Sequence, residues 1–209
     1  MIISLTGFMG CGKSSVGREL SRLLCCPFMD LDTVIEERAG RSIPEIFAED
    51  GEKVFRQMEL EALQALTVSE TRDLKQSLPS QAMGPSLCGQ RGSTVSNPLP
   101  PTPNVNKGSL ESILILALGG GAVMTKECAE IVREQTLCIY LKASVETLME
   151  HLSGGEAAGR PMLQGDSLRT RIEGLMDLRA ETYEKTAHII IDTDGKSIEE
   201  IAGIIKDRI

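Results

Sequence analysis

A short glycine-rich stretch near the start of the chain has the composition and spacing of a phosphate-binding loop. The sequence GFMGCGKS, residues 7–14, follows an apolar run and precedes an amphipathic one, so it joins a predicted strand to a predicted helix. The glycines allow backbone N–H groups to turn inward around an anion, and the start of the helix adds partial positive charge. We expect a nucleoside triphosphate, most simply ATP, to bind at Gly10, Cys11, Gly12, Lys13, Ser14 and Ser15.

Two side chains of this loop have the chemistry that phosphoryl transfer requires. The ammonium group of Lys13 would reach the β- and γ-phosphates, which makes it a predicted catalytic residue. The hydroxyl group of Ser14 would bind Mg²⁺. We expect the carboxylate of Asp30 to support the same ion, directly or through water.

A pair of acids provides a candidate site for the phosphoryl acceptor. The segment PFMDLD predicts a second strand over 27–32 that ends in Asp30 and Asp32. Because alternate residues of a strand point to the same side, we expect both carboxylates to face one way. Asp32 could then accept hydrogen bonds from substrate hydroxyl groups and take a proton. Two solvated acids at a strand end are the simpler alternative.

Glycines and arginines complete the set of candidate site residues. Gly119, Gly120 and Gly121 follow a buried strand predicted over 113–118 and would let a ligand lie against the backbone, although a tight turn is the alternative. Arg56 and Arg179, on predicted helices, suit bidentate capture of a carboxylate. Arg160 lies in a predicted glycine-rich lid, 153–165, from which it could neutralise the transferring phosphoryl group. Each arginine taken singly is equally compatible with a structural role.

The elements that must position these residues alternate between strand and helix. Apolar runs predict strands over 2–5, 27–32, 113–118, 137–141 and 189–191, separated by amphipathic helices. We therefore expect an α/β fold, a P-loop kinase fold, with a five-stranded parallel sheet flanked by helices, as in the nucleoside-monophosphate kinases, and with a mobile lid. Helical periodicity places Val54 and Leu178 among the inward-facing residues of their helices.

Composition limits the class of protein. The formal net charge is −8, which argues against nucleic acid or an anionic membrane as a partner. No apolar run approaches the roughly 20 residues that span a bilayer, and no leader precedes the first strand. Six cysteines lack the spacing of a disulfide framework or a zinc site, so we expect a cytoplasmic protein. A GTPase would need an NKxD motif, which is absent from the sequence.

One segment differs from the rest of the single domain predicted over 1–209. Residues 67–112 are rich in Pro, Ser and Gly and show no sustained periodicity, so we interpret them as a largely irregular insertion. The insertion precedes the strand at 113–118, at the end of the sheet opposite to the expected catalytic edge. It is therefore expected to be tolerated rather than catalytic, either as a passive excursion or as a docking segment.

Several motifs together resemble the shikimate kinases. These are GFMGCGKSSVGREL, MDLD, AGRSIPEIFAEDGEKVFRQMELEAL, LALGGGAV, GRPML and LRAETYEKTA, and they cover nearly the whole chain apart from the insertion. The resemblance implies ATP-dependent phosphorylation of the 3-hydroxyl group of shikimate, a step in chorismate and aromatic amino-acid synthesis, by a monomeric enzyme. A kinase of another small hydroxy acid, such as gluconate, and a catalytically inactive nucleotide-binding module are the alternatives.

The resemblance also assigns roles to individual residues. It implies that Asp32 binds the ring hydroxyls and acts as base or orienter, and that Arg56 and Arg179 hold the carboxylate. It implies that Gly120 contacts the substrate through its backbone and that Arg160 reaches the ATP phosphates.

The chain departs from the family pattern just before the lid. Members commonly place an arginine there, stacked on adenine, whereas this chain has MEHLS at 149–153. Either His151 stacks on the base or Leu152 simply packs.

Overall fold

The computed structural model describes residues 1–68, 113–152 and 168–209. The predicted lid at 153–165, Arg160 within it, and residues 69–112 of the predicted insertion lie outside the described residues. The first two residues of the predicted insertion belong to a helix that ends at Val68.

The described residues form one parallel sheet. Its strands are β1 (Ile2–Thr6), β2 (Phe28–Asp30), β3 (Leu114–Ala117), β4 (Leu137–Lys142) and β5 (Ile189–Asp192), in the spatial order β2-β3-β1-β4-β5. All four strand pairs are parallel. The predicted five-stranded parallel sheet is therefore confirmed, and the carboxyl ends of all five strands meet at one edge, where α/β proteins bind ligands.

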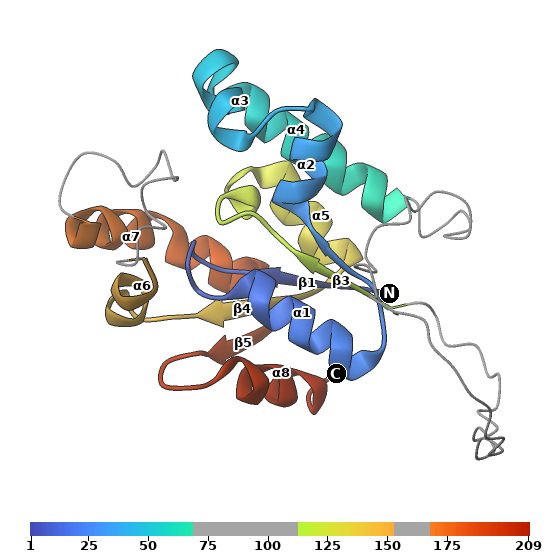
Figure 1. The fold of residues 1–209 in the computed structure, drawn as a ribbon, viewed down its shortest axis with the longest axis vertical. Coiled ribbons are helices and arrows are strands. Elements are labelled where there is room, and N and C mark those ends of the chain that lie inside the picture. Colours follow the sequence, from blue (N-terminus) through green and yellow to red (C-terminus); the bar gives the residue numbers. More distant parts are fainter. Residues whose placement is uncertain (69–112, 153–167) are drawn as a thin grey trace, which may run out of the picture.

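Helices cover both faces of the sheet (Figure 1). They are α1 (Lys13–Leu24), α2 (Leu31–Ala39), α3 (Ile43–Glu49), α4 (Gly51–Val68), α5 (Lys126–Gln135), α6 (Val145–Leu152), α7 (Leu168–Thr186) and α8 (Ile198–Lys206), with a 3₁₀ turn, η2 (Ala122–Met124). Capping boxes begin α3 at Ser42 and α8 at Ser197, and each satisfies backbone N–H groups that a helix start leaves unpaired. No helix within the described ranges is long and apolar enough to cross a membrane.

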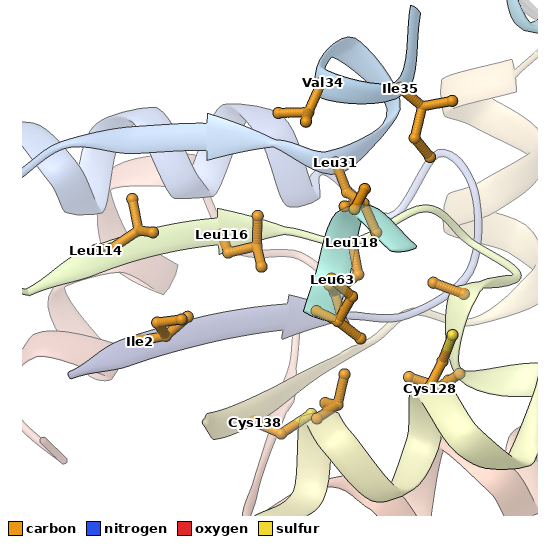
Figure 2. Close-up of a cluster of buried hydrophobic side chains, with 14 of the residues drawn as sticks. Ile2, Leu31, Val34, Ile35, Leu63, Leu114, Leu116, Leu118, Cys128 and Cys138 are labelled. Atoms are coloured by element: carbon orange, nitrogen blue, oxygen red, sulfur yellow. The ribbon is translucent and has the colours of Figure 1, made fainter. Parts of the chain in front are cut away.

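Strand alternation divides the core into two clusters. Ile2, Leu114 and Leu116 point to the face covered by α2, α4 and α5, whereas Ile3 and Ile115 point to the face covered by α1 and α8. Figure 2 shows the first cluster, in which Leu31 and Leu118 pack with Leu63 of α4. Because both faces are buried, β1 and β3 are apolar along most of their length, as parallel strands usually are.

Two residues that the periodicity placed inward are exposed. Val54 is 40% exposed and Leu178 is 77% exposed, so both predictions were wrong. In each helix the next residue, Phe55 or Arg179, takes the buried position. The buried face of α7 includes the polar residues Arg179 and Thr186. A search for apolar residues alone therefore selected Leu178 in place of its neighbour Arg179.

We expect Leu63→Ala to lower the free energy of unfolding by about 3 kcal/mol, because Leu63 is completely buried beneath the sheet and its loss would leave a cavity. Denaturant unfolding would measure the change. Leu178→Ala is the matched control, and its exposed position predicts a change within about 0.5 kcal/mol. Equal effects of the two substitutions would contradict this assignment of the core.

Candidate active site

The phosphate loop joins β1 to α1 at the carboxyl edge of the sheet. Gly7, Gly10 and Gly12 have φ values of 141°, 82° and 89°, which other L-residues rarely adopt. A Cβ atom at Gly7 would also lie 2.6 Å from the carbonyl oxygen of Leu141. The glycines therefore set the path of the loop, and its last residues lead directly into the N-terminus of α1.

Lys13 lies over this loop. Its ammonium group donates hydrogen bonds to the carbonyl oxygens of Gly7, at 3.0 Å, and Phe8, at 2.9 Å. The same nitrogen lies 3.9 Å from Sγ of the buried Cys11. Two neutral carbonyl groups compensate a cation less strongly than a phosphate does. A phosphate entering the loop would therefore exchange favourably with these partners.

Asp30 links the phosphate loop to the neighbouring strand. The hydroxyl group of Ser14 donates to Oδ2 of Asp30 at 2.6 Å, and Oδ1 of Asp30 accepts the backbone N–H of Asp32 at 3.1 Å. Asp30 is thus the N-cap of α2, and Asp32 lies in the first turn of that helix. The expectation that both acids continue one strand was wrong, because the capping preference of aspartate ends the strand at Asp30.

The glycine segment after β3 is the centre of the acceptor half of the site. A Cβ atom at Gly119 would lie 2.6 Å from Oδ1 of Asp32 and 2.9 Å from Oε1 of Glu59. A Cβ atom at Gly121 would lie 2.6 Å from both terminal nitrogens of Arg56. A side chain at either glycine would therefore require these carboxylate and guanidinium groups to shift.

Arg56 is paired with two acids of its own helix. Its NH1 group donates to Oε2 of Glu59 at 2.6 Å, and its NH2 group donates to Oε1 of Glu52 at 2.9 Å. The side chain of Glu59 is 1% exposed and that of Glu52 is 51% exposed. The first pair is therefore a buried structural contact, and the second is a surface pair that a ligand could replace at little cost.

Arg179 approaches the same glycine segment from α7. Its NH1 group lies 3.4 Å from the carbonyl oxygen of Gly120, and the hydroxyl group of Tyr183 donates to that same oxygen. The guanidinium group also lies 6.0 Å from the centre of the Phe8 ring. Arg179 is 6% exposed, so it is held between α7, the glycine segment and the phosphate loop.

Glu59 is a site residue that the sequence analysis missed. Burial raises its pKa to about 7, although the guanidinium group of Arg56 beside it acts in the opposite direction. The nearby carboxylate of Asp32 raises that pKa further, and the guanidinium group of Arg179 lowers it. The available signal was an acid three residues after Arg56, on the same stripe as the buried Phe55.

One cavity of about 900 Å³ extends from the phosphate loop to Asp32 and Gly120. Its lining comprises residues 9–16 of the phosphate loop and α1, then Asp30, Asp32, Leu118 and Gly120, then Thr147, Glu150 and His151, and finally Thr193, residues 195–199 and Ile201. The predicted nucleotide-binding residues of the loop all line it. Arg56 and Arg179 do not line the cavity but approach the glycine segment at Gly121 and Gly120, and the third predicted arginine, Arg160, is outside the described residues.

At the end of α6, the sequence left open whether His151 stacks on the base or Leu152 simply packs, and the structure shows where each side chain lies. Leu152 is 1% exposed and packs against Gly10, where an added Cβ atom would lie 3.0 Å from its Cγ. His151 is exposed, lines the cavity, and has Nδ1 2.8 Å from the carbonyl oxygen of Gly10. Because a carbonyl oxygen can only accept, Nδ1 carries the proton and Nε2 is the nitrogen available to a ligand.

Comparison with known proteins identifies a consistent set of relatives. The family model described as shikimate kinase matches residues 9–73 and 105–209. A shikimate kinase from Thermus thermophilus is 34% identical over 207 residues, which cover 99% of this chain and 89% of that protein. A shikimate kinase from Zymomonas mobilis is 34% identical over 203 residues, covering 97% of this chain and 90% of that protein.

Solved structures give the same result. The shikimate kinase from Acinetobacter baumannii, in complex with shikimate, has a TM-score of 0.75 and 28% identity, covering 99% of this chain and 91% of that chain. The shikimate kinase from Aquifex aeolicus has a TM-score of 0.65 and 26% identity, and the match covers 100% of this chain and 95% of that chain.

We expect the stability of the protein to depend on the ionisation of Glu59. The folded-state pKa of about 7 lies above the ordinary value of 4.5, so the folded state binds a proton that the unfolded state has lost between these pH values. The contribution of Glu59 to the free energy of unfolding is complete below pH 4.5. It declines by on the order of 3 kcal/mol as the pH rises through 7. Denaturant unfolding at a series of pH values would measure this slope.

Glu59→Gln should remove that part of the slope, whatever its effect on absolute stability. Glu61→Gln is the matched control, since Glu61 lies on the exposed side of the same helix and should leave the slope unchanged. The assignment fails if the Glu59 variant retains the slope of the parent protein.

Proposed function

The chain belongs to the shikimate kinase family, and we propose that it transfers the γ-phosphoryl group of ATP to the 3-hydroxyl group of shikimate. The product, shikimate 3-phosphate, serves chorismate and aromatic amino-acid biosynthesis. The observation that carries this proposal is the single cavity, which runs from the phosphate loop around Lys13 to Asp32 and Gly120. A phosphoryl donor and an acceptor placed at these two ends would face each other across the carboxyl edge of the sheet.

The chemistry of shikimate matches the acceptor half of the site. Shikimate has vicinal hydroxyl groups and one carboxylate. We assign the hydroxyl groups to Asp32, which orients the attacking oxygen and accepts its proton, and the carboxylate to Arg56 and Arg179. To bind that carboxylate, Arg56 can release the exposed Glu52 while it keeps the buried Glu59.

Gly120 contributes through its backbone. Its carbonyl oxygen already accepts the hydroxyl group of Tyr183 and lies within reach of Arg179. The contact with shikimate therefore uses the N–H group of Gly120. These bonds to the carbonyl also fix the orientation of the peptide that presents the N–H group.

The phosphate loop holds the donor. Its backbone N–H groups and the start of α1 surround the β-phosphate, and Lys13 moves from the carbonyl oxygens of Gly7 and Phe8 to the β- and γ-phosphates. Arg160, from the segment that the sequence predicts to be a lid, neutralises the transferring group. Transfer then depends on positioning and charge compensation rather than on a covalent intermediate.

The residues beside the loop fit a magnesium ion. Ser14 and Asp30 place a hydroxyl and a carboxylate oxygen 2.6 Å apart, and oxygen ligands are those that Mg²⁺ prefers. The described ranges contain no cluster of three or more His, Cys, Asp or Glu side chains that could hold a metal ion, which suits an ion bound mainly by water and phosphate. When bound, Mg²⁺ would neutralise phosphate charge.

Other features of the protein are part of the same proposal. We propose a cytoplasmic monomer without nucleic-acid or membrane partners, in which residues 67–112 are an insertion outside the catalytic unit. The family model leaves residues 74–104 unmatched, in support of such an insertion. Five cysteines in the described ranges are free thiols, in keeping with a reducing compartment. The kinase of another hydroxy acid, such as gluconate, is the disfavoured alternative.

A substrate panel would test the proposed reaction directly. ADP release in the presence of ATP and Mg²⁺ should require shikimate, and gluconate or nucleoside monophosphates should not replace it. Phosphorus NMR of the product would show whether the 3-hydroxyl group carries the phosphate. Release of ADP with gluconate but not with shikimate would overturn the proposal, and so would release that no acceptor stimulates.

We expect Asp32→Asn to lower kcat by about 100-fold or more, because the neutral amide cannot take the proton of the attacking hydroxyl group. ADP affinity, measured by calorimetry, should stay within about twofold of the parent, since the substitution leaves the phosphate loop and Lys13 unchanged. Asp207→Asn, an exposed change at the end of α8, is the control. Near-normal turnover in the Asp32 variant would remove Asp32 from its assigned role.

A further inference from the structure

The far end of the cavity, away from Asp32, has two walls that come from separate parts of the chain. One wall is the side of α6 that carries Thr147 and His151. The other wall is the segment between β5 and α8, which contributes Thr193 and residues 195–199. Because the phosphate loop lies between this end and Asp32, the base and ribose of the nucleotide would lie between these two walls.

Asp194 joins the two walls. Its Oδ1 atom accepts the backbone N–H of Ser144 at 2.9 Å and the hydroxyl group of Thr147 at 2.7 Å. Ser144 and Thr147 are themselves bonded, since the hydroxyl oxygen of Ser144 accepts the N–H of Thr147 at 3.3 Å. A single carboxylate oxygen on the β5–α8 segment therefore holds the first turn of α6.

Asp194 is also fixed to its own strand. Its backbone N–H donates to Oδ1 of Asp192, the last residue of β5, at 2.9 Å. The segment is thus attached to the sheet on one side and to α6 on the other. A shift of either wall would break at least one of these bonds.

The opposite end of α6 touches the phosphate loop. Leu152 packs against Gly10, and Nδ1 of His151 donates to the carbonyl oxygen of Gly10 at 2.8 Å. Helix α6 therefore spans the nucleoside end of the cavity, with the phosphate loop at its C-terminus and Asp194 at its N-terminus. Leu148 anchors the middle of the helix in the core, and the two end contacts set its position relative to the phosphate loop and the β5–α8 segment.

We propose that Asp194 is a positioning residue for the nucleoside part of ATP: it fixes the β5–α8 segment against α6 and thereby sets the width of the space that takes the base and ribose. The proposal rests on the proposed function only in taking the nucleotide to be ATP. Asp194 acts through the two walls and touches neither the phosphates nor the acceptor.

For joining the two walls, the position of Oδ1 of Asp194 as a hydrogen-bond acceptor matters more than the negative charge of the carboxylate. Partial burial raises the pKa of Asp194, but the hydrogen bonds from Ser144 and Thr147 lower it more, so the net pKa lies below its ordinary value. Both donors are neutral groups that reach the same oxygen. An asparagine at this position would keep that oxygen as an acceptor, whereas an alanine would remove it.

The test compares Asp194→Ala with Asp194→Asn. We expect the alanine variant to weaken ADP binding, measured by calorimetry, by about tenfold, because it removes both hydrogen bonds that join the two walls. The KM for ATP should rise by a similar factor, while kcat and the KM for shikimate stay within about twofold of the parent. The asparagine variant should stay within about threefold of the parent in every measurement.

The matched control is Glu184→Ala. Glu184 also bridges two elements, through a 2.9 Å bond to Lys142, but it is exposed and lies outside the cavity. Should Asp194→Ala not fold, Thr147→Val removes one of the two donors at nearly constant volume and should weaken ADP binding by about threefold. Where Asp194→Ala does fold, adding Thr147→Val to it should cause no further loss of ADP affinity, because the acceptor of the threonine hydroxyl group is already absent.

Three results would overturn the proposal. They are unchanged ADP affinity in Asp194→Ala, an equal rise in the KM for ATP and for shikimate, and an asparagine variant as weak as the alanine variant. ADP binding needs neither shikimate nor turnover. Failure of the proposed reaction would therefore appear in the substrate panel and leave this measurement interpretable.

Discussion

The acceptor half of the site depends on a backbone segment without side chains. The carboxyl oxygens of Asp32 and Glu59 approach Gly119, and the guanidinium group of Arg56 approaches Gly121, so closely that a Cβ atom at either glycine would require these groups to shift. The parallel sheet presents this segment at its carboxyl edge, directly beside the phosphate loop. An alanine at Gly119 or Gly121 would displace these charged groups. The two glycines therefore allow the acidic side chains and Arg56 to lie together against the backbone.

The charges around that segment explain how the site can be buried and still bind an anion. Asp32 and Glu59 face two arginines, so the cluster is close to neutral before a ligand enters. Burial raises the pKa of Glu59 to about 7, so this acid takes up a proton more readily than an exposed glutamate does. An incoming carboxylate would raise that pKa further, because like charges disfavour ionisation, and Glu59 would then take up a proton. The buried acid thus lets the arginines hold an anion without leaving an unpaired charge.

The sequence predicted the parts of this site that depend on local pattern. The phosphate loop and the five strands follow from spacing alone, and each is present. It did not predict that Asp30 caps a helix, because strand alternation and capping compete for the same residue. It also missed Glu59: its spacing from Arg56 and Phe55 placed it on the buried stripe of α4, but its approach to Gly119 arises only when α4 packs against the glycine segment.

The two halves of the site are mechanically linked through the phosphate loop. Phosphoryl transfer requires the γ-phosphate and the attacking oxygen to lie in line and nearly in contact, so a small displacement of either slows the reaction. Gly10 contacts α6, and Phe8 lies under the guanidinium group of Arg179, so the loop meets the nucleoside wall on one side and the acceptor site on the other. A disturbance of α6 would therefore reach the acceptor only through the loop. Because the loop is continuous with β1, the central strand of the sheet, it can resist that displacement.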